Sequence, residues 1–262
     1  MLLDEKIFKS KKDIKYLFYP NKESKFLVVI FSSYAVSKTI KATYNYMESL
    51  KDIKINKLFI LDDYGYDGRG CWYLGENLDF KVEYSVNELI KYIQNENNIQ
   101  SDNIIACGSS KGGFAATYYG IKYGYGHIVI AAPQILLYNY ISNFENILKS
   151  MENKEYDTKN ILNNLILNLD ICEYTKFHIY CGILDGHLKQ HVIPLVKKIF
   201  KQNNKVYLEL MDANHGNVGI FFREKLREDI NSIVEGDVLY SNKLEIETIL
   251  KKYDIWYKNL NI

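Results

Sequence analysis

The chain has 262 residues, of which 47% are hydrophobic, and this fits one α/β domain with a sizeable core. Its 33 Lys and Arg residues nearly cancel its 32 Asp and Glu residues, and no basic block occurs, so the composition argues against a nucleic-acid or membrane-surface partner. The longest apolar runs, such as residues 26–31, fall far short of the about 20 residues that span a bilayer. Charged residues at positions 4–6 likewise argue against a secretory signal.

Short apolar runs recur along the chain, as expected of strands that are buried on both faces of a parallel sheet. In chain order they cover residues 26–31, 57–61, 103–107, 127–131, 177–183 and 205–211. A further run, Ile14–Phe18, predicts an antiparallel edge strand near the N-terminus. The four cysteines show no CxxC or metal-ligand spacing, and Cys107 and Cys181 lie inside apolar runs. We therefore expect buried thiols, a reducing cytoplasmic location and no metal site.

Helical patterns separate several of these strands. One apolar face consists of Val82, Val86, Leu89, Ile90 and Ile93, and a second of Val192, Leu195, Val196 and Ile199. Strands that alternate with helices predict βαβ units and a mostly parallel, doubly wound sheet. Only three prolines and no linker-like stretch or repeat occur, so we expect a single domain over residues 1–262, closed by a helix within 239–262.

Residues 134–176 interrupt this alternation, because no strand pattern occurs there and Tyr, Asn and Leu are abundant. We expect two or three helices in this insertion, which precedes the strand at 177–183. A long excursion in a regular α/β domain is often a lid over an active site. The alternative is an ordinary helical insertion with no part in binding.

Residues 108–112 read Gly-Ser-Ser-Lys-Gly and match the pattern G-x-S-x-G with Ser110 at its centre. This pattern makes a nucleophile elbow, in which small residues allow a strained strand-to-helix turn that exposes the serine hydroxyl. A predicted strand precedes the motif and a helix candidate follows it, which is the context that the elbow requires. The alternative is a purely structural or phosphate-binding turn, but the P-loop spacing is absent.

A serine nucleophile needs a base and an acid, which in this kind of fold follow it along the chain in the order acid, then histidine. His215 lies in a predicted loop after the run at 205–211, and Asp185 lies in the loop after 177–183. Asp212 is the competing acid, but it stands only three residues before His215. We therefore predict catalytic Ser110, Asp185 and His215.

The oxyanion of an acyl-transfer intermediate needs two backbone N–H donors. We expect one from Lys111, directly after the nucleophile, and one from Tyr34 in the turn after residues 26–31. The turn reads Ser32-Ser33-Tyr34, so Ser33 stands where a glycine would tolerate positive φ more easily.

Three stretches together resemble the α/β-hydrolase superfamily, and within it the branch of accessory Sec system and capsular polysaccharide biosynthesis proteins. They are LDDYGYDGRGCWYLGENLDF (61–80), GSSKGGFAATYYGIKYG (108–124) and AAPQILLYNYI (131–141). The resemblance implies the α/β-hydrolase fold, a triad of Ser110, Asp185 and His215, and a glycan-related substrate. It implies no bound cofactor.

The loop at residues 62–76 is expected at the carboxyl edge of the sheet, where ligands bind in open α/β folds. Arg69, Trp72 and Tyr73 in this loop are candidates for pairing with an anionic group and stacking on a sugar ring. The alternative is that the loop folds back and covers the core.

The sequence thus predicts a serine hydrolase (an esterase or deacylase) or an O-acyltransferase that works through an acyl-serine on an acylated glycan or small ester. Two alternatives stay open. One is a catalytically silent protein partner in a glycan-modifying or secretion assembly, and the other is a serine peptidase of the same fold.

Overall fold

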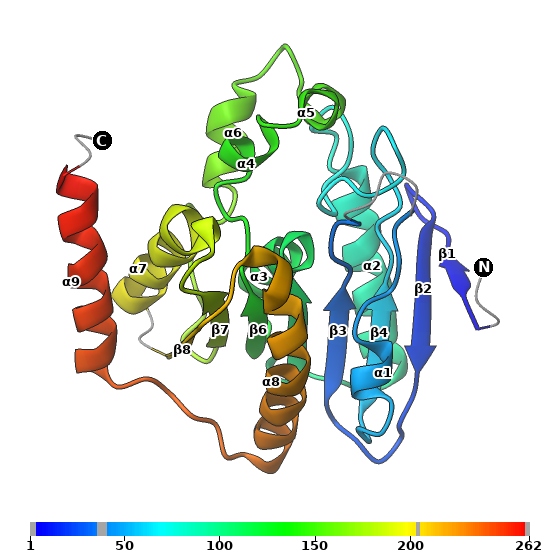
Figure 1. The fold of residues 1–262 in the computed structure, drawn as a ribbon. Helices are drawn as coiled ribbons and strands as arrows, with labels where there is room; N and C mark the ends of the chain where they lie inside the picture. Colours follow the sequence, from blue (N-terminus) through cyan, green and yellow to red (C-terminus); the bar gives the residue numbers. More distant parts are fainter. Residues whose placement is uncertain (1–3, 36–40, 203–204, 260–262) are drawn as a thin grey trace.

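A central sheet with helices on both faces forms the framework of the protein, here a computed structural model that describes residues 4–35, 41–202 and 205–259 (Figure 1). The strand order is β1-β2-β4-β3-β5-β6-β7-β8. Strands β1 and β2 are antiparallel to their neighbours, whereas β3 to β8 run parallel. The expected doubly wound, mostly parallel sheet is therefore confirmed, and the carboxyl ends of the parallel strands share one edge. The strands are β1 (Lys6–Phe8), β2 (Ile14–Tyr19), β3 (Leu27–Phe31), β4 (Asn56–Ile60), β5 (Ile104–Ser109), β6 (His127–Ala131), β7 (Lys176–Gly182) and β8 (Val206–Met211).

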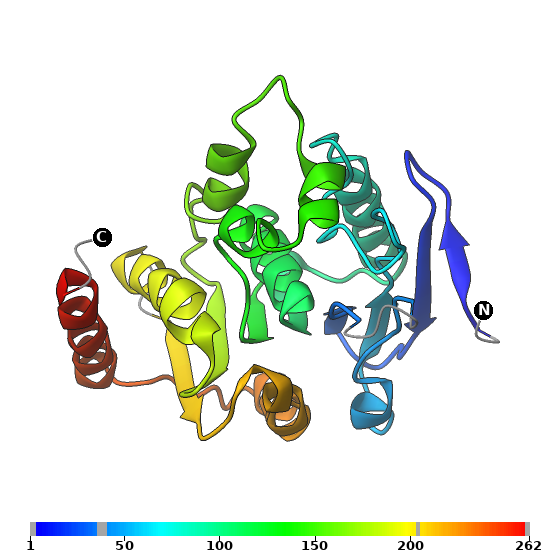
Figure 2. The same cartoon turned by 45° about the horizontal axis from the view of Figure 1, so that its top comes forward.

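The helices cover the two faces of this sheet. They are α1 (Met47–Leu50), α2 (Lys81–Glu96), α3 (Lys111–Lys122), α4 (Leu137–Ile141), α5 (Glu145–Met151), α6 (Thr158–Asn164), α7 (Ile193–Gln202), α8 (His215–Glu235) and α9 (Lys243–Asn259). Helices α2 and α3 lie on one face, and α1 and α8 lie on the other (Figure 2). Strands β3, β4, β5 and β6 are buried along their whole length, and Cys107 and Cys181 lie in β5 and β7 as expected. None of the described helices combines the length and apolar character that crossing a bilayer requires.

The excursion between β6 and β7 forms the short helices α4, α5 and α6, which lie beyond the carboxyl edge of the sheet (Figure 1). Two backbone bonds join it to the loop that follows β4: Asn77 N–H donates to the Ser150 carbonyl at 2.9 Å, and Leu78 N–H donates to the Met151 carbonyl at 3.1 Å. The insertion is thus attached to the loop at residues 61–80 as well as to the sheet.

Helix α8 begins at His215, a residue that the sequence placed in a loop. The side chain of Asn214 caps the helix by accepting the N–H of Asn217. Gly216 and Gly219 lower the helix propensity of the first turn, which is why the pattern there reads as a loop. Val218, Phe222 and the apolar residues that follow them at helical spacing are buried and hold the helix on the sheet.

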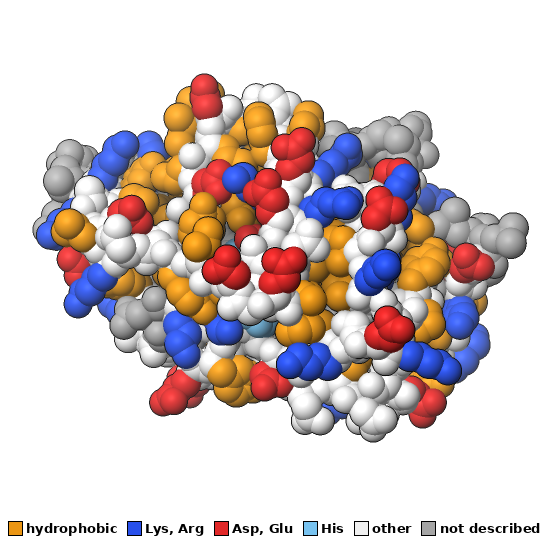
Figure 3. All heavy atoms as spheres, turned by 90° about the horizontal axis from the view of Figure 1, so that it is seen from below, with side chains coloured by type: hydrophobic (Ala, Val, Ile, Leu, Met, Phe, Trp, Pro, Cys, Tyr) orange, Lys and Arg blue, Asp and Glu red, His pale blue; other side chains and the backbone are white. Residues whose placement is uncertain are grey.

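Basic and acidic side chains lie side by side across the face at the amino-terminal edge of the sheet (Figure 3). This distribution matches the near balance of charge in the sequence. The carboxyl edge, on the opposite side, holds the residues of the predicted site.

Two glycines allow α3 to approach the sheet closely. A Cβ on Gly108 would lie 2.4 Å from the Gly112 carbonyl carbon, and one on Gly112 would lie 2.3 Å from the Phe31 carbonyl oxygen. Both contacts involve backbone, which cannot move aside as a flexible side chain does. These glycines therefore set the position of the turn that carries Ser110.

Gly112→Ala is expected to lower the free energy of unfolding by about 1–3 kcal/mol, because the added methyl overpacks α3 against β3. Gly186→Ala is the matched control, since a Cβ there would meet nothing within 4 Å. Urea unfolding of both variants measures the difference. Equal stability of the two variants would show that the close approach is not a constraint.

Candidate active site

Ser110 occupies the sharp turn between β5 and α3. Its backbone has φ 54° and ψ −117°, a region that is costly for a residue with a side chain. The Ser110 N–H donates to the Ala131 carbonyl on β6 at 2.9 Å, which holds the strained turn in place. The hydroxyl therefore stands at the carboxyl edge of the sheet, as a nucleophile elbow requires.

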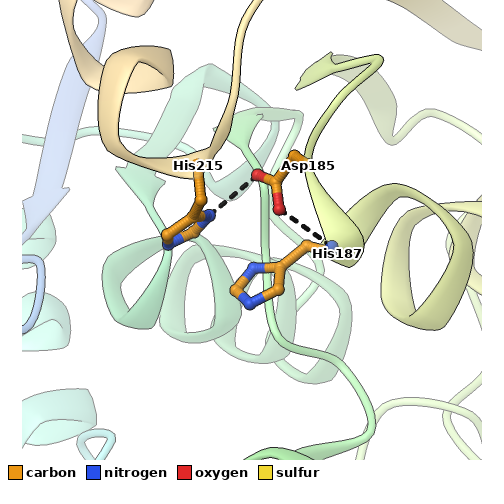
Figure 4. A group of neighbouring side chains, drawn as sticks. All are labelled: Asp185, His187 and His215. Atoms are coloured by element: carbon orange, nitrogen blue, oxygen red, sulfur yellow. Dashed lines mark hydrogen bonds and ion pairs between the residues drawn. The ribbon is translucent and has the colours of Figure 1, made fainter.

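Ser110, His215 and Asp185 form a hydrogen-bonded chain. The Ser110 Oγ lies 3.2 Å from His215 Nε2. His215 Nδ1 lies 2.8 Å from Asp185 Oδ2, as Figure 4 shows. Since a carboxylate can only accept, Nδ1 carries the proton and Nε2 is left to accept from the serine hydroxyl. Asp212, the competing acid in the sequence, is exposed, and Asp185 is the acid that contacts His215.

Asp185 is held as a buried carboxylate. Burial raises its pKa, but the hydrogen bond from His215 and the backbone N–H of His187, 2.8 Å from Oδ1, lower it further than burial raises it. The net shift is downward, so the group is ionised at neutral pH. The negative charge of Asp185 can therefore stabilise the imidazolium that forms when a histidine base accepts the serine proton.

His187 packs against the base and was not singled out by the sequence for this site. Its ring centroid lies 4.0 Å from that of His215, and its Nδ1 lies 3.2 Å from the Ala132 carbonyl (Figure 4). Within the described residues, Asp185, His187 and His215 form the one group whose ligand atoms are close enough to hold a metal ion. Two of these three residues, Asp185 and His215, are already joined by a hydrogen bond, which accounts for their closeness without a metal ion.

His191 joins the start of the insertion to the region of the acid. It lies in a π-helical turn (Leu188–Val192) before α7, and its Nδ1 accepts the Leu136 N–H at 3.2 Å. Burial lowers the pKa of His191 to about 3, so the ring stays neutral in the folded protein.

This histidine should make the fold sensitive to acid. Between pH 6.5 and about 3 the unfolded chain binds a proton at His191 that the folded chain does not, so the free energy of unfolding falls as pH falls, by about 1.4 kcal/mol per unit. His191→Asn keeps an acceptor for Leu136 N–H and should reduce the slope by that amount. Urea unfolding at several pH values from 4 to 7 measures the two slopes, and identical slopes would contradict the assignment.

Of the two predicted N–H donors, Lys111 begins α3 and Tyr34 lies three residues beyond the end of β3. Lys111 is the first residue of α3, so its N–H has no helical carbonyl to bond. Ser33, beside Tyr34, does not adopt positive φ, and its Oγ donates to the Ser109 carbonyl at 3.1 Å. A serine in place of glycine thus ties the turn after β3 to the elbow without strain.

The predicted sugar-stacking role of Trp72 and Tyr73 is wrong for this conformation, because both rings are fully buried. Tyr73 donates its hydroxyl to the Ile60 carbonyl, and Tyr34 stacks on Trp72 at 5.4 Å. Arg69 is also engaged, since its guanidinium pairs with Asp67 and lies 4.5 Å over the Tyr34 ring. The loop folds back onto the core, which is the alternative that the sequence left open.

A buried ion pair holds this loop under the nucleophile. Lys111 Nζ lies 3.0 Å from Asp62 Oδ2, and both side chains are 0% exposed. Asp62 also accepts the backbone N–H groups of Cys71 and Tyr73. Gly70, at φ +126°, leaves room for the ammonium, because a Cβ there would lie 2.2 Å from Nζ.

Lys111→Met should lower the free energy of unfolding by about 3–5 kcal/mol, because it leaves the Asp62 carboxylate buried without its cation. Lys149→Met removes a partner from the exposed Lys149–Glu145 pair and should leave stability unchanged. Chemical denaturation of both variants gives the comparison. A small effect at Lys111 would mean that Asp62 is satisfied by its backbone donors alone.

Gln134, for which no role is predicted from the sequence, contacts the nucleophile directly. Its Nε2 donates to Ser110 Oγ at 2.6 Å, and its Oε1 accepts from Trp72 Nε1 at 2.9 Å. The available signal was its position, three residues beyond the end of β6 and so at the same sheet edge as the elbow.

A pocket of about 580 Å³ lies beside this chain of residues. Its walls include hydroxyl and amide groups of Ser33, Thr43, Asn45 and Tyr46, with Gly216 next to the base and Arg223 on α8. The rest of the wall is largely apolar, so the pocket suits a ligand such as a sugar ring, which has apolar faces and hydroxyl groups, and Arg223 would suit one that carries negative charge.

Comparison with known proteins supports the fold. Residues 67–177 match a family described as Uncharacterised protein family (UPF0227). Among curated proteins, none matches the sequence. A capsule O-acetyltransferase of Neisseria meningitidis serogroup A is similar in structure, with a TM-score of 0.74, 25% identity and coverage of 88% of this chain and 96% of that one.

Two further solved structures share the fold at lower identity. The Glycosylation Associate Protein (Gap123) complex from Streptococcus agalactiae gives a TM-score of 0.72 at 21% identity over 88% of this chain, which spans 47% of that one. The fluorophosphonate-binding serine hydrolase FphF of Staphylococcus aureus gives 0.61 at 13% identity, over 88% and 97% of the two chains. The α/β-hydrolase fold and the expected resemblance to its capsule- and glycosylation-associated members are confirmed.

Proposed function

We propose that this protein is a serine acyl enzyme that transfers an acyl group to a glycan hydroxyl through an acyl-Ser110 intermediate. The observation that carries the proposal is the hydrogen-bonded chain from Ser110 Oγ through His215 to Asp185. Its order along the chain and its position at the carboxyl edge of the sheet are those of a serine acyl-transfer site.

In the first half of the reaction, Ser110 Oγ attacks the acyl carbonyl carbon while its proton passes to His215 Nε2. Asp185 stabilises the imidazolium, and the N–H groups of Lys111 and Tyr34 are the donors for the oxyanion. The tetrahedral intermediate collapses, and His215 returns the proton to the leaving group. In the second half, His215 takes the proton of the acceptor hydroxyl as its oxygen attacks the acyl carbonyl carbon. The bond from that carbon to Ser110 Oγ then breaks, and His215 returns the proton to Oγ.

Two observations favour a sugar hydroxyl over water as the final acceptor. The pocket beside Ser110 combines apolar wall surface with several hydroxyl and amide groups, and its size accepts a saccharide unit. The similar Neisseria meningitidis protein is a capsule O-acetyltransferase, and nearly all of its chain is covered. Arg223 on the pocket wall would favour an acceptor or donor that carries negative charge.

The insertion at residues 134–176 is proposed to act as a lid over this site. Tyr140 on α4 lies edge-on to both Trp72, at 6.1 Å, and His187, at 5.3 Å, so the insertion contacts both the aromatic cluster and the histidine that packs against the base. A cover at this place would exclude water from the acyl-serine, which a transferase needs.

A fluorophosphonate probe should label the purified protein once, at Ser110, because only an activated serine reacts. Ser110→Ala and His215→Ala should each lower turnover of p-nitrophenyl acetate by at least about 10³-fold with little change in melting temperature. Intact-mass analysis and peptide mapping locate the adduct. Ser109, the adjacent serine, serves as an internal control, and an adduct there would contradict the assignment.

The acceptor is tested on the same protein. Addition of oligosaccharides should raise p-nitrophenol release and yield acetylated sugar, detected by mass spectrometry. Acetate alone would indicate an esterase. Cleavage of peptides but not of esters would indicate a peptidase, and no adduct in folded protein would indicate the silent protein partner.

A further inference from the structure

We infer that Gln134 is a further catalytic residue of this site and that Trp72 is the residue that positions it. The inference rests on the proposed function, because it concerns how Ser110 is prepared for attack. It starts from a connected pair of hydrogen bonds, Trp72 to Gln134 and Gln134 to Ser110, which meets the nucleophile in addition to its bond with His215.

The orientation of the Gln134 amide is fixed by its neighbour. An indole N–H can only donate, so the amide must present its oxygen to Trp72 and its NH₂ group to Ser110. The distances agree with this, at 2.9 Å from Trp72 Nε1 to Oε1 and 2.6 Å from Nε2 to Ser110 Oγ. A reversed amide would lose the bond from the buried Trp72 N–H and could only accept the serine O–H, so the orientation with the oxygen toward Trp72 is strongly favoured.

Trp72 is itself held rigidly. It is fully buried, stacks on Tyr34 at an interplanar angle of 19°, and meets the edge of Tyr140. Its loop is tied down by the Asp62 carboxylate, which accepts the N–H groups of Cys71 and Tyr73 on either side of it. Gln134 is likewise 0% exposed, so water does not compete for its amide.

This arrangement directs the serine proton. A hydroxyl has one O–H and two lone pairs, and the Gln134 N–H occupies a lone pair of Ser110 Oγ. The O–H is then free to point to His215 Nε2 at 3.2 Å. As the proton moves to His215, negative charge grows on Oγ and the hydrogen bond from Gln134 strengthens. The same bond stabilises Oγ when it leaves in the second half of the reaction.

Gln134→Leu keeps the approximate size of the side chain and removes the donor. We expect it to slow fluorophosphonate labelling by about 10- to 100-fold through the rate of the covalent step, with the affinity for the probe unchanged. Gln134→Asn, whose amide is one methylene too short, should behave in the same way. Thr117→Val is the control, because it removes a buried hydroxyl on α3 that bonds only the Gly113 carbonyl among the described contacts.

A double-mutant cycle separates this role from a structural one. Trp72→Phe removes the indole N–H and should slow labelling in the wild-type background by releasing the amide. In the Gln134→Leu background the same change should have no further effect on the rate, because no amide remains to be oriented. If each substitution acted only by damaging the structure, the effects of the two on the labelling rate would instead add.

The outcomes are distinguishable from failure of the proposed function. Wild-type protein that is never labelled would overturn the proposed function. If the wild-type protein is labelled and both Gln134→Leu and Gln134→Asn are labelled at the wild-type rate, the role of Gln134 is overturned and the proposed function is not. If Gln134→Leu does not fold, as judged by its melting curve, Gln134→Asn and Trp72→Phe still decide the question, and unchanged rates in both would reject the inference.

Discussion

The buried ion pair between Lys111 and Asp62 is the interaction on which the site depends. The ammonium belongs to the residue directly after the nucleophile, and the carboxylate begins the loop that follows β4. Two opposite charges without water attract strongly, and each would be very costly without the other. The pair therefore holds the loop against the first turn of α3, and the Asp62 carboxylate folds the loop further by accepting two of its backbone N–H groups.

That loop in turn supplies the aromatic support of the nucleophile. Trp72 is carried beneath the insertion, where it meets Tyr34 from the turn after β3 and Tyr140 from α4. Three segments that are far apart in sequence thus converge around one indole ring. Ser33 makes a parallel link on the other side, from the turn after β3 to the Ser109 carbonyl. The elbow is held from both flanks, which is how a strained φ of 54° at Ser110 persists.

Much of this could be predicted from the sequence. Apolar runs located the parallel strands because strands buried on both faces leave an unambiguous signal, and the glycines around Ser110 located the turn. Asp185 and His215 followed from the order of chain segments, and the structure brings both to Ser110, although their catalytic roles stay predictions. The errors of the sequence-based prediction have a different cause. Whether the ring of Trp72 faces water or the core depends on a charge 39 residues later in the chain, which no local pattern contains.

Gln134 marks the boundary between the sheet and the excursion that follows β6, and the segment around it is buried, with Ile135 and Leu137 at 0% exposure. The base of the excursion is therefore fixed by the same contacts that serve the nucleophile. Beyond α4 the insertion makes no contact with the nucleophile among the described hydrogen bonds; the end of α5 is joined to residues 77 and 78, and many side chains there face solvent. Evolution can thus lengthen, shorten or rewrite the distal part to suit a new acceptor while the base stays the same. An insertion with a buried base and a more exposed distal part is a natural place for relatives of this protein to diverge in specificity, and a suitable place to graft a new specificity by design.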